Sequence, residues 1–297
     1  MIAQERGFLL LASHLGDPGR RPLSAAQLRL LAQRMQMTEP VTDNRDLLPG
    51  DLVKLGYSRE MAAHIHHLLS QEDVLDHYLS RGRKSGCVPV TRISDGYPLI
   101  LRKRLGLDSP GCLWAKGDLS LLQMPAIALV GSRDLRAPNR QFAEAVGLYA
   151  SQQGLVLVSG NARGADKTAQ NACLKAGGNV ISIVADALAS HAPRENMLYL
   201  SEEDFDAQFT AQRAISRNRC IHALGRMVFV AQASLEKGGT WDGTAKNLRA
   251  GWSSVACFRD GSDAARRLEQ LGAYLITSAD LDDMDGLPET TESLFDR

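Results

Sequence analysis

The chain has 297 residues, of which 44% are hydrophobic and 23% charged, as in an ordinary globular protein large enough for two domains. Lys and Arg together number 34, and Asp and Glu also number 34, so the net charge is zero. This balance excludes a protein coated in positive charge, such as a histone-like binder, but it allows a local basic groove.

The five cysteines are scattered, odd in number and without a Cys-x-x-Cys pair, which predicts free thiols in a reducing compartment. The first residues lack the features of a signal peptide, and no apolar run has the length of a membrane span. We therefore expect a soluble cytoplasmic protein without membrane contact.

Helical periodicity dominates the chain up to about residue 80. Apolar residues recur at helical spacing over residues 8–15 and 28–35, and residues 52–69 predict two short helices joined at Gly56, with Ser58 as the N-cap of the second. We expect residues 1–82 to form a small helical domain. Residues 83–123 carry two short apolar runs, at 88–90 and 113–117, and are expected to be a connector that packs on the next domain.

Strand and helix signals alternate from residue 124 onward. Continuous apolar runs occur at 126–130, 155–158, 180–184, 227–231, 254–258 and 273–276, with helical segments between them. This pattern is typical of a parallel sheet that is covered on both faces. The sequence thus predicts a doubly wound, Rossmann-like α/β domain with a mostly parallel sheet over residues 124–280, followed by an acidic tail at 281–297.

The first apolar run of this domain ends in Gly131-Ser132-Arg133. In an open parallel sheet, ligands bind beyond the carboxyl ends of the strands. Glycine lets a backbone approach an anion, the serine hydroxyl donates, and arginine matches phosphate with two parallel hydrogen bonds. This motif is a candidate phosphate contact; its plainer interpretation is a tight turn with a solvated arginine.

A stronger anion signal follows the second run, where a glycine-rich loop leads directly into a helix. Its candidate residues are Ser159, Gly160, Arg163, Gly164 and Asp166. Backbone amides and the helix dipole favour an anion at such a helix N-terminus. The aspartate is expected to cap the helix or to hold the neighbouring arginine, and the alternative is capping and close packing without a ligand.

A third glycine-rich loop opens a helix after the run at 227–231. Its candidates are Lys237, Gly238, Gly239, Thr240 and Thr244, which offer a lysine and two hydroxyls to anionic oxygens. The loop lacks the spacing of a nucleoside-triphosphatase loop, and no Gly-x-Gly-x-x-Gly motif follows the first strand. We expect the three loops to meet at one edge of the sheet.

A basic run lies just before the strand predicted at 227–231. Arg217, Asn218 and Arg219 are placed to approach the same edge, although a basic run by itself is usually a solvated helix face. Trp241 is a candidate for stacking on a base, with a packing role slightly preferred. The sequence offers no nucleophile–base pair and no convincing metal ligands beside His64 and His67, so no catalytic residue, metal or cofactor is expected.

In this order, the segments resemble the DNA-processing protein A family (DprA/Smf). The resemblance rests on VGSR at 130–133, SGNARGAD at 159–166, RNRCIHALG at 217–225 and the third glycine-rich loop. It implies an extended Rossmann fold that binds single-stranded DNA, forms a homodimer and supports a RecA-type recombinase. It also implies that the helical domain is similar to SAM or helix-hairpin-helix domains. The phosphate or structural contacts implied by the resemblance are Arg133, Arg163, Arg217 and Arg219, in a pocket shaped by Gly131, Ser132, Gly160 and Gly164.

The alternative is a nucleotide-binding sensor or a nucleotide hydrolase on the same fold. A related hydrolase fold has a similar glycine-rich loop followed by a catalytic glutamate, whereas here Ala245-Lys246-Asn247 follows the loop. Because this glutamate is absent, a nucleotide hydrolase is the less favoured alternative, and a nucleotide-binding sensor stays open.

Overall fold

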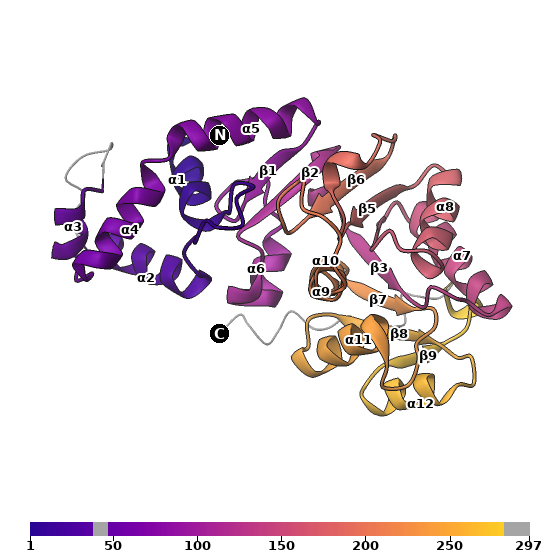
Figure 1. Cartoon of the computed structure of the whole chain (residues 1–297). Coiled ribbons are helices and arrows are strands. Elements are labelled where there is room, and N and C mark those ends of the chain that lie inside the picture. The colour runs from indigo at the N-terminus through magenta and orange to yellow at the C-terminus, as the bar shows by residue number, and fades with distance from the viewer. Residues whose placement is uncertain (38–46, 282–297) are drawn as a thin grey trace.

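The computed structural model describes residues 1–37 and 47–281, and within them nine strands form one sheet (Figure 1). The order across the sheet is β1-β2-β6-β5-β4-β3-β7-β8-β9. The strands are β1 (Val88–Thr91), β2 (Cys112–Gly117), β3 (Ala126–Val130), β4 (Val156–Ser159), β5 (Asn179–Ile183), β6 (Met197–Ser201), β7 (Met227–Val230), β8 (Ser254–Phe258) and β9 (Tyr274–Ile276). Strands β3 to β9 are parallel, and β1 and β2 are antiparallel to their neighbours. Apart from Leu281, the acidic tail predicted at 281–297 lies outside the described residues.

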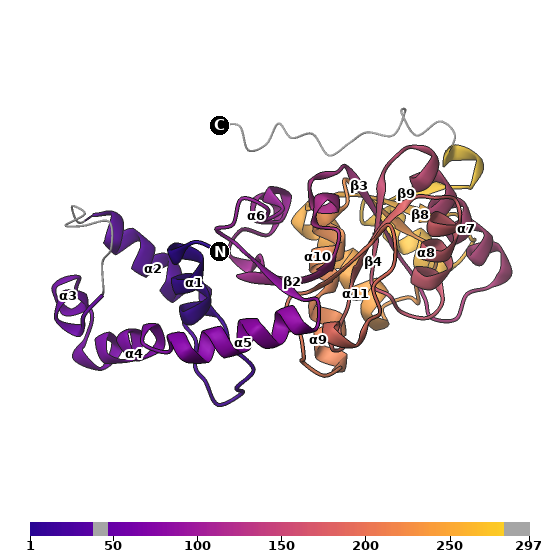
Figure 2. The same cartoon turned by 90° about the horizontal axis from the view of Figure 1, so that it is seen from above.

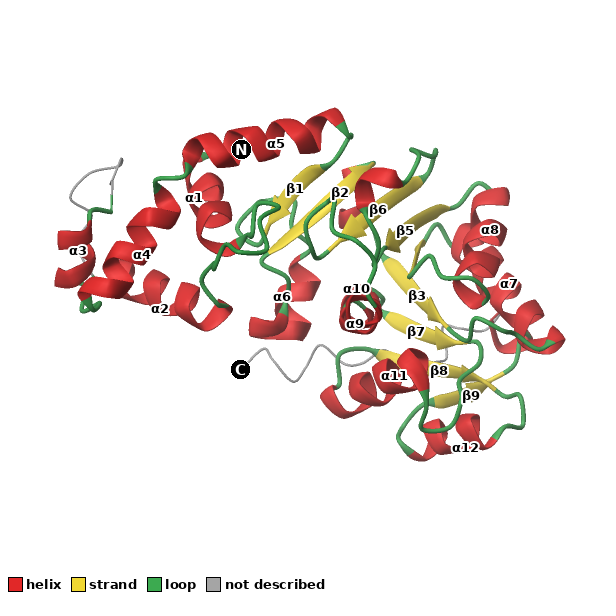
Figure 3. Ribbon diagram, in the orientation of Figure 1, coloured by secondary structure: helices red, strands yellow, loops and turns green. Residues whose placement is uncertain are grey.

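Helices cover both faces of this sheet (Figure 3). In β3, Ile127 and Leu129 belong to the core on one face, and Ala128 and Val130 belong to the core on the other. The continuous apolar runs are therefore explained by burial on both faces. The predicted doubly wound α/β fold with a mostly parallel sheet is confirmed.

The helices of the sheet domain fall into two layers. The first core contains side chains from α7 (Ala137–Gln152) and α8 (Ala165–Lys175). The second contains side chains from α6 (Leu99–Leu105), α10 (Asn218–Leu224), α11 (Gly238–Ala250) and α12 (Asp263–Gln270). The short helix α9 (Ala211–Ser216) precedes α10, and short 3-10 turns occupy Gly106–Asp108, Leu119–Gln123 and Leu188–Ser190.

Strand β6 has no counterpart among the predicted strands. All five of its residues, Met197–Ser201, are buried between β5 and β2. The run was missed because no α-helix separates it from β5; only the short turn at Leu188–Ser190 and an irregular loop intervene. Strand β6 also pairs with β2, and β2 pairs with β1. Residues 88–117 therefore extend the sheet beyond its parallel part.

The N-terminal helices are α1 (Ala3–Ala12), α2 (Ala25–Gln36), α3 (Pro49–Lys54), α4 (Arg59–Leu69) and α5 (Glu72–Lys84). They gather at the end of the molecule opposite α7 and α8 (Figure 1, Figure 2). Leu31, Leu52 and Ile65 belong to their own small core. The predicted N-cap is confirmed, because the Ser58 hydroxyl accepts a hydrogen bond from the amide of Met61 at 3.1 Å.

An aromatic cluster joins this helical region to the sheet. Tyr78 of α5 packs edge-on against Trp114 of β2, with ring centroids 5.4 Å apart, and Phe205 lies 4.8 Å from both rings. Each of these rings is almost fully buried. In the described part of the chain, no helix has both the length and the apolar character needed to cross a membrane.

Candidate functional site

The candidate site lies at the topological switch point of the sheet, between β4, β3 and β7. From β3 the chain adds β4, β5 and β6 on one side, and then returns to place β7 on the other side of β3. The loops after β3 and β7 consequently lead in opposite directions, which opens a crevice at the carboxyl ends of the strands. The parallel pairing puts the three predicted glycine-rich loops at this edge.

Backbone contacts join these loops. The amide of Ser132 donates to the carbonyl of Gln232 after β7 at 2.9 Å, and the amide of Ala165 donates to the carbonyl of Ser132 at 3.1 Å. Gly164 has φ +85°, and a Cβ atom there would lie 2.4 Å from the carbonyl oxygens of Ser132 and Arg133. Only glycine allows this close approach, so the loops after β3 and β4 are locked together.

A cavity of about 370 Å³ lies over the ends of β4 and β5. Three of the residues that line it are arginines: Arg133 after β3, Arg163 after β4, and Arg217 between α9 and α10. Residues 160–162 after β4 and Asp186 after β5 also line it. Three guanidinium groups and one carboxylate give the cavity a positive charge.

Arg217 is the buried cation of this cavity, with 6% of its surface exposed. Its Nη1 donates to the carbonyl of Ile183 at 2.8 Å, and its buried Nε has no partner among the described residues. Burial lowers the pKa of Arg217, and the nearby Asp166 carboxylate opposes that shift. Because a buried cation is costly unless it is paired, a guanidinium held at a cavity wall favours an anion in that cavity.

Asp166 accepts hydrogen bonds from two backbone amides of the loop that was predicted to bind an anion. Its Oδ2 accepts hydrogen bonds from the amides of Gly160 and Ala162, both at 3.1 Å. Burial raises the pKa of Asp166, while Arg217 and the two amides lower it. These two amides are therefore already occupied by Asp166, and an external anion depends on the arginine side chains instead.

Two expectations for this loop need correction. Asp166 does not hold Arg163; that arginine instead pairs with the exposed Asp134 at 2.8 Å. Ser159 is fully buried and accepts from the Nε2 of Gln170 at 2.6 Å, so its hydroxyl supports the loop from below and does not face the cavity. The reason is that a strand's last residue points to one face of the sheet rather than past its end.

The third glycine-rich loop lies beside the cavity without lining it. Lys237 is the N-cap residue of α11, and Gly238, Gly239 and Thr240 form the first turn of that helix. The Asn218 side chain donates to the carbonyl of Gly239 at 3.0 Å, which ties α10 to α11. This contact gives Asn218 a structural role in the described residues.

Two residues further along α11 are buried in the core. Thr244 is completely buried, and its hydroxyl has no partner in the described part of the chain. Trp241 is 7% exposed and belongs to the core on this face of the sheet. The packing interpretation of Trp241 is therefore confirmed, and its ring is not available for stacking on a base.

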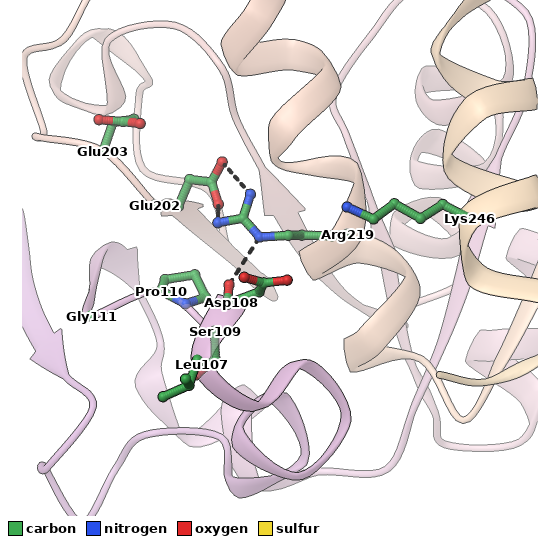
Figure 4. A pocket seen from close by; sticks show the side chains of 9 residues that line it. All are labelled: Leu107, Asp108, Ser109, Pro110, Gly111, Glu202, Glu203, Arg219 and Lys246. Atoms are coloured by element: carbon green, nitrogen blue, oxygen red, sulfur yellow. Dashed lines mark hydrogen bonds and ion pairs between the residues drawn. The ribbon is translucent and has the colours of Figure 1, made fainter. Parts of the chain in front are cut away.

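Arg219 lines a different cavity, of about 440 Å³, near the end of β6 (Figure 4). Its guanidinium pairs with the Glu202 carboxylate at 2.8 Å, and its Nε donates to the carbonyl of Asp108 at 3.0 Å. Lys246 of α11 extends toward the same group. Because Glu202 is almost fully buried, this pair anchors α10 to the loop after β6, and the hydrogen bond to Asp108 ties α10 to the loop before β2. Arg217 and Arg219 do not share a site.

A comparison with known protein families shows the family to which the chain belongs. The family described as DNA recombination-mediator protein A matches residues 89–281. The chain belongs to this family.

Characterised members of the DNA recombination-mediator protein A family are similar over most of their length. The DNA processing protein DprA of Streptococcus pneumoniae is 30% identical over 248 residues, which cover 79% of this chain and 86% of that protein. The DprA of Bacillus subtilis is 30% identical over 230 residues, covering 72% and 76% of the two chains.

Solved structures of the family share the fold. The crystal structure of the Streptococcus pneumoniae protein superposes with a TM-score of 0.67 at 26% identity, over 86% of this chain and 91% of that one. The Helicobacter pylori DNA processing protein A superposes with a TM-score of 0.55 at 22% identity, over 67% of this chain and 95% of that one.

Several cavity residues were missed from the sequence. Asp186 lies shortly after the end of β5, so the same search beyond strand ends would have found it. Phe209 and Ala214 come from the segment before α10 and also line the cavity. No local signal in the sequence places that segment over the end of β4.

Proposed function

We propose that this protein binds single-stranded DNA without cleaving it, with backbone phosphates held in the cavity by Arg133, Arg163 and Arg217. The observation that carries the proposal is the buried guanidinium of Arg217 at the wall of a cavity that Arg133 and Arg163 also line. The Helicobacter pylori protein with this fold binds single-stranded DNA, which supports the same ligand here.

The polar groups of the cavity suit binding rather than catalysis. Arginines neutralise phosphates and position a strand, and they are too basic to exchange protons with a substrate. Family membership further supports a homodimer and a RecA-type recombinase as partner, and we propose both on that ground alone.

The test is a titration of fluorescently labelled oligothymidine, followed by anisotropy over a range of salt concentrations. The wild type should bind with an affinity that falls steeply with salt, because each neutralised phosphate contributes about −0.7 to the logarithmic slope for single strands. The double variant Arg133→Ala/Arg163→Ala should bind more weakly and show a shallower slope. These two side chains are the better targets because Arg217 is buried.

Arg266→Ala is the matched control. Arg266 is also an exposed arginine paired with an aspartate, Asp263, but it lies on α12. Its loss should leave affinity and slope unchanged. A wild type that does not bind oligothymidine, or that loses it to an equal concentration of a mononucleotide, would contradict the proposal and favour the nucleotide sensor.

A further inference from the structure

Acidic side chains follow β6 on the stretch of chain that leads to the cavity lined by the three arginines, here called the arginine-lined cavity. Residues 202–206 read Glu-Glu-Asp-Phe-Asp, and the chain then continues through α9 to Arg217. We call residues 202–210 the acidic segment. Carboxylates beside a phosphate site oppose binding by repulsion, so the role of this segment depends on what its carboxylates contact.

Asp204 is bound by the loop between α1 and α2. Its Oδ1 accepts a hydrogen bond from the hydroxyl of Ser13 at 3.2 Å, and its Oδ2 accepts one from the amide of Gly16 at 2.9 Å. Both carboxylate oxygens therefore contact the N-terminal helical region. Through these bonds the acidic segment is joined to a part of the chain that lies 191 residues earlier, at Ser13.

Asp206 makes a second link to the helical region. Its Oδ2 pairs with Nη2 of Arg81 in α5 at 2.6 Å. Between the two aspartates, the ring of Phe205 packs against Tyr78 of the same helix, with centroids 4.8 Å apart. Three consecutive residues, at positions 204, 205 and 206, thus attach the acidic segment to the N-terminal helices.

The other end of the acidic segment is connected to the cavity. The Gln208 side chain donates to the carbonyl of Asp206 at 3.1 Å, and the Arg213 side chain of α9 donates to the carbonyl of Gln208. The Thr210 hydroxyl caps α9 by accepting from the amide of Arg213 at 3.1 Å. The amide of Arg217 donates in turn to the carbonyl of Arg213 at 3.0 Å. A displacement of the acidic segment would therefore move the backbone that presents Arg217 to the cavity.

We propose that Asp204 and Asp206 are positioning residues for DNA binding, which clamp the acidic segment to the N-terminal helices and thereby hold Arg217 in place. This inference rests on the proposed function. Among the described residues, neither carboxylate lines the arginine-lined cavity, so each acts through the segment. The helical region is then a control element, because a partner that shifts it changes the affinity of the cavity for single-stranded DNA.

The first test uses the sign of the effect. A carboxylate that only repels the ligand strengthens binding when it is removed. Asp206→Ala should instead weaken binding of oligothymidine by about fivefold, the upper end of what an exposed ion pair contributes. Asp204→Ala loses two hydrogen bonds and should weaken binding at least as much.

Arg81 distinguishes positioning from direct contact with a phosphate. Loss of an arginine that contacts a phosphate makes the salt slope shallower by about 0.7 for single strands. Arg81→Ala should lower the affinity and leave this slope unchanged, since Arg217 still reaches the phosphate once the segment is ordered. The charge exchange Arg81→Asp/Asp206→Arg should restore most of the affinity. A loss that the exchange does not restore would show that the pair is not the cause.

Arg6→Ala is the matched control. Arg6 of α1 also pairs with carboxylates of α5, those of Glu72 and Asp76, but it does not contact the acidic segment. Its loss should leave the affinity for oligothymidine unchanged. Urea unfolding should show similar, small losses of stability in Arg6→Ala and Arg81→Ala, so stability alone would not separate the two variants.

Hydrogen exchange of the wild type provides a measurement without substitutions. Coupling between two sites is reciprocal, so DNA bound at the cavity should stabilise the contacts of the acidic segment. Oligothymidine should therefore slow amide exchange in residues 202–210 and in residues 13–16, where the Gly16 amide is bonded to Asp204. Protection confined to the residues that line the cavity would contradict the coupling.

The two proposals fail in different ways. Unchanged or stronger binding by Asp204→Ala and Asp206→Ala, with a wild type that binds in a salt-sensitive manner, would overturn the positioning role and leave the proposed function standing. A shallower salt slope in Arg81→Ala would make Arg81 a phosphate contact and would overturn it too. Absence of any binding by the wild type would remove both proposals.

Discussion

Gly160 and Arg217 are matched to each other at the cavity wall. A Cβ atom at Gly160 would lie 1.6 Å from Nη1 of Arg217, so the guanidinium occupies the space that any other residue's side chain would need. The same nitrogen donates to the carbonyl of Ile183. The glycine is therefore required by a side chain far along the sequence, and its backbone φ is not in the left-handed region.

Gly160→Ala should weaken binding of single-stranded DNA by about tenfold, the equivalent of about 1.4 kcal/mol, because Arg217 must leave its place. Anisotropy titrations with oligothymidine measure this effect. In a protein that already carries Arg217→Ala, the added Gly160→Ala should cost almost nothing, since the collision is gone. Losses that simply add in the double variant would show that the two residues act independently.

Asp166→Ala should destabilise the protein by about 1–3 kcal/mol for each of the two amides that it leaves unpaired. Urea unfolding measures the change in the free energy of unfolding. Asp166→Asn is the control, because the side-chain oxygen can take the place of Oδ2 toward Gly160 and Ala162. It should lose much less stability than the alanine variant; equal losses would mean that the negative charge matters more than the hydrogen bonds.

Gly147→Ala should destabilise the protein by about 1–3 kcal/mol, although alanine is the better helix former. A Cβ atom at Gly147 of α7 would lie 2.3 Å from the carbonyl oxygen of Ala169, where α7 packs on α8. Gly7 in α1 offers the opposite case, because nothing lies within 4 Å of its added Cβ. Gly7→Ala should raise the free energy of unfolding by up to about 1 kcal/mol. Thermal and urea unfolding of both variants test the contrast, and effects of the same sign would contradict it.

Acid should destabilise the fold through His222, which is fully buried in α10 and has no partner for either ring nitrogen among the described residues. Burial lowers the pKa of His222 from 6.5 to about 3. Between these two pH values the unfolded chain binds a proton that the folded chain does not. Stability is thus fully present above pH 6.5 and falls as the pH decreases toward 3, by up to about 1.4 kcal/mol per pH unit.

His222→Leu should lose this part of the acid sensitivity and keep its stability at neutral pH, because an apolar side chain leaves no unpaired polar atom. Urea unfolding at several pH values between 4 and 8 compares the two proteins. An identical pH dependence in both would show that His222 does not cause the acid sensitivity.

Local signals in the sequence were sufficient for the parallel part of the fold. Runs such as 126–130 and 227–231 are apolar throughout because strands buried on both faces have no solvent side. The rule that ligands bind beyond strand ends also selected Arg133 and Arg163, which line the cavity. Strand β6 escaped the same reasoning, since its connection to β5 lacks the helix that marks the pattern.

Only the tertiary structure decided which polar side chains line the cavity and which pair with other residues of the protein. Arg217 and Arg219 are two positions apart, and residues so spaced project about 200° apart around a helix of 3.6 residues per turn. One therefore enters the arginine-lined cavity, and the other pairs with Glu202. Phe209 reaches the cavity because a loop from β6 crosses over to it. Sequence alone determined which residues carry the charges of this protein, because residue type and strand periodicity are local properties. Which of those charges face a ligand depends on contacts between distant segments, and these form only when the chain packs.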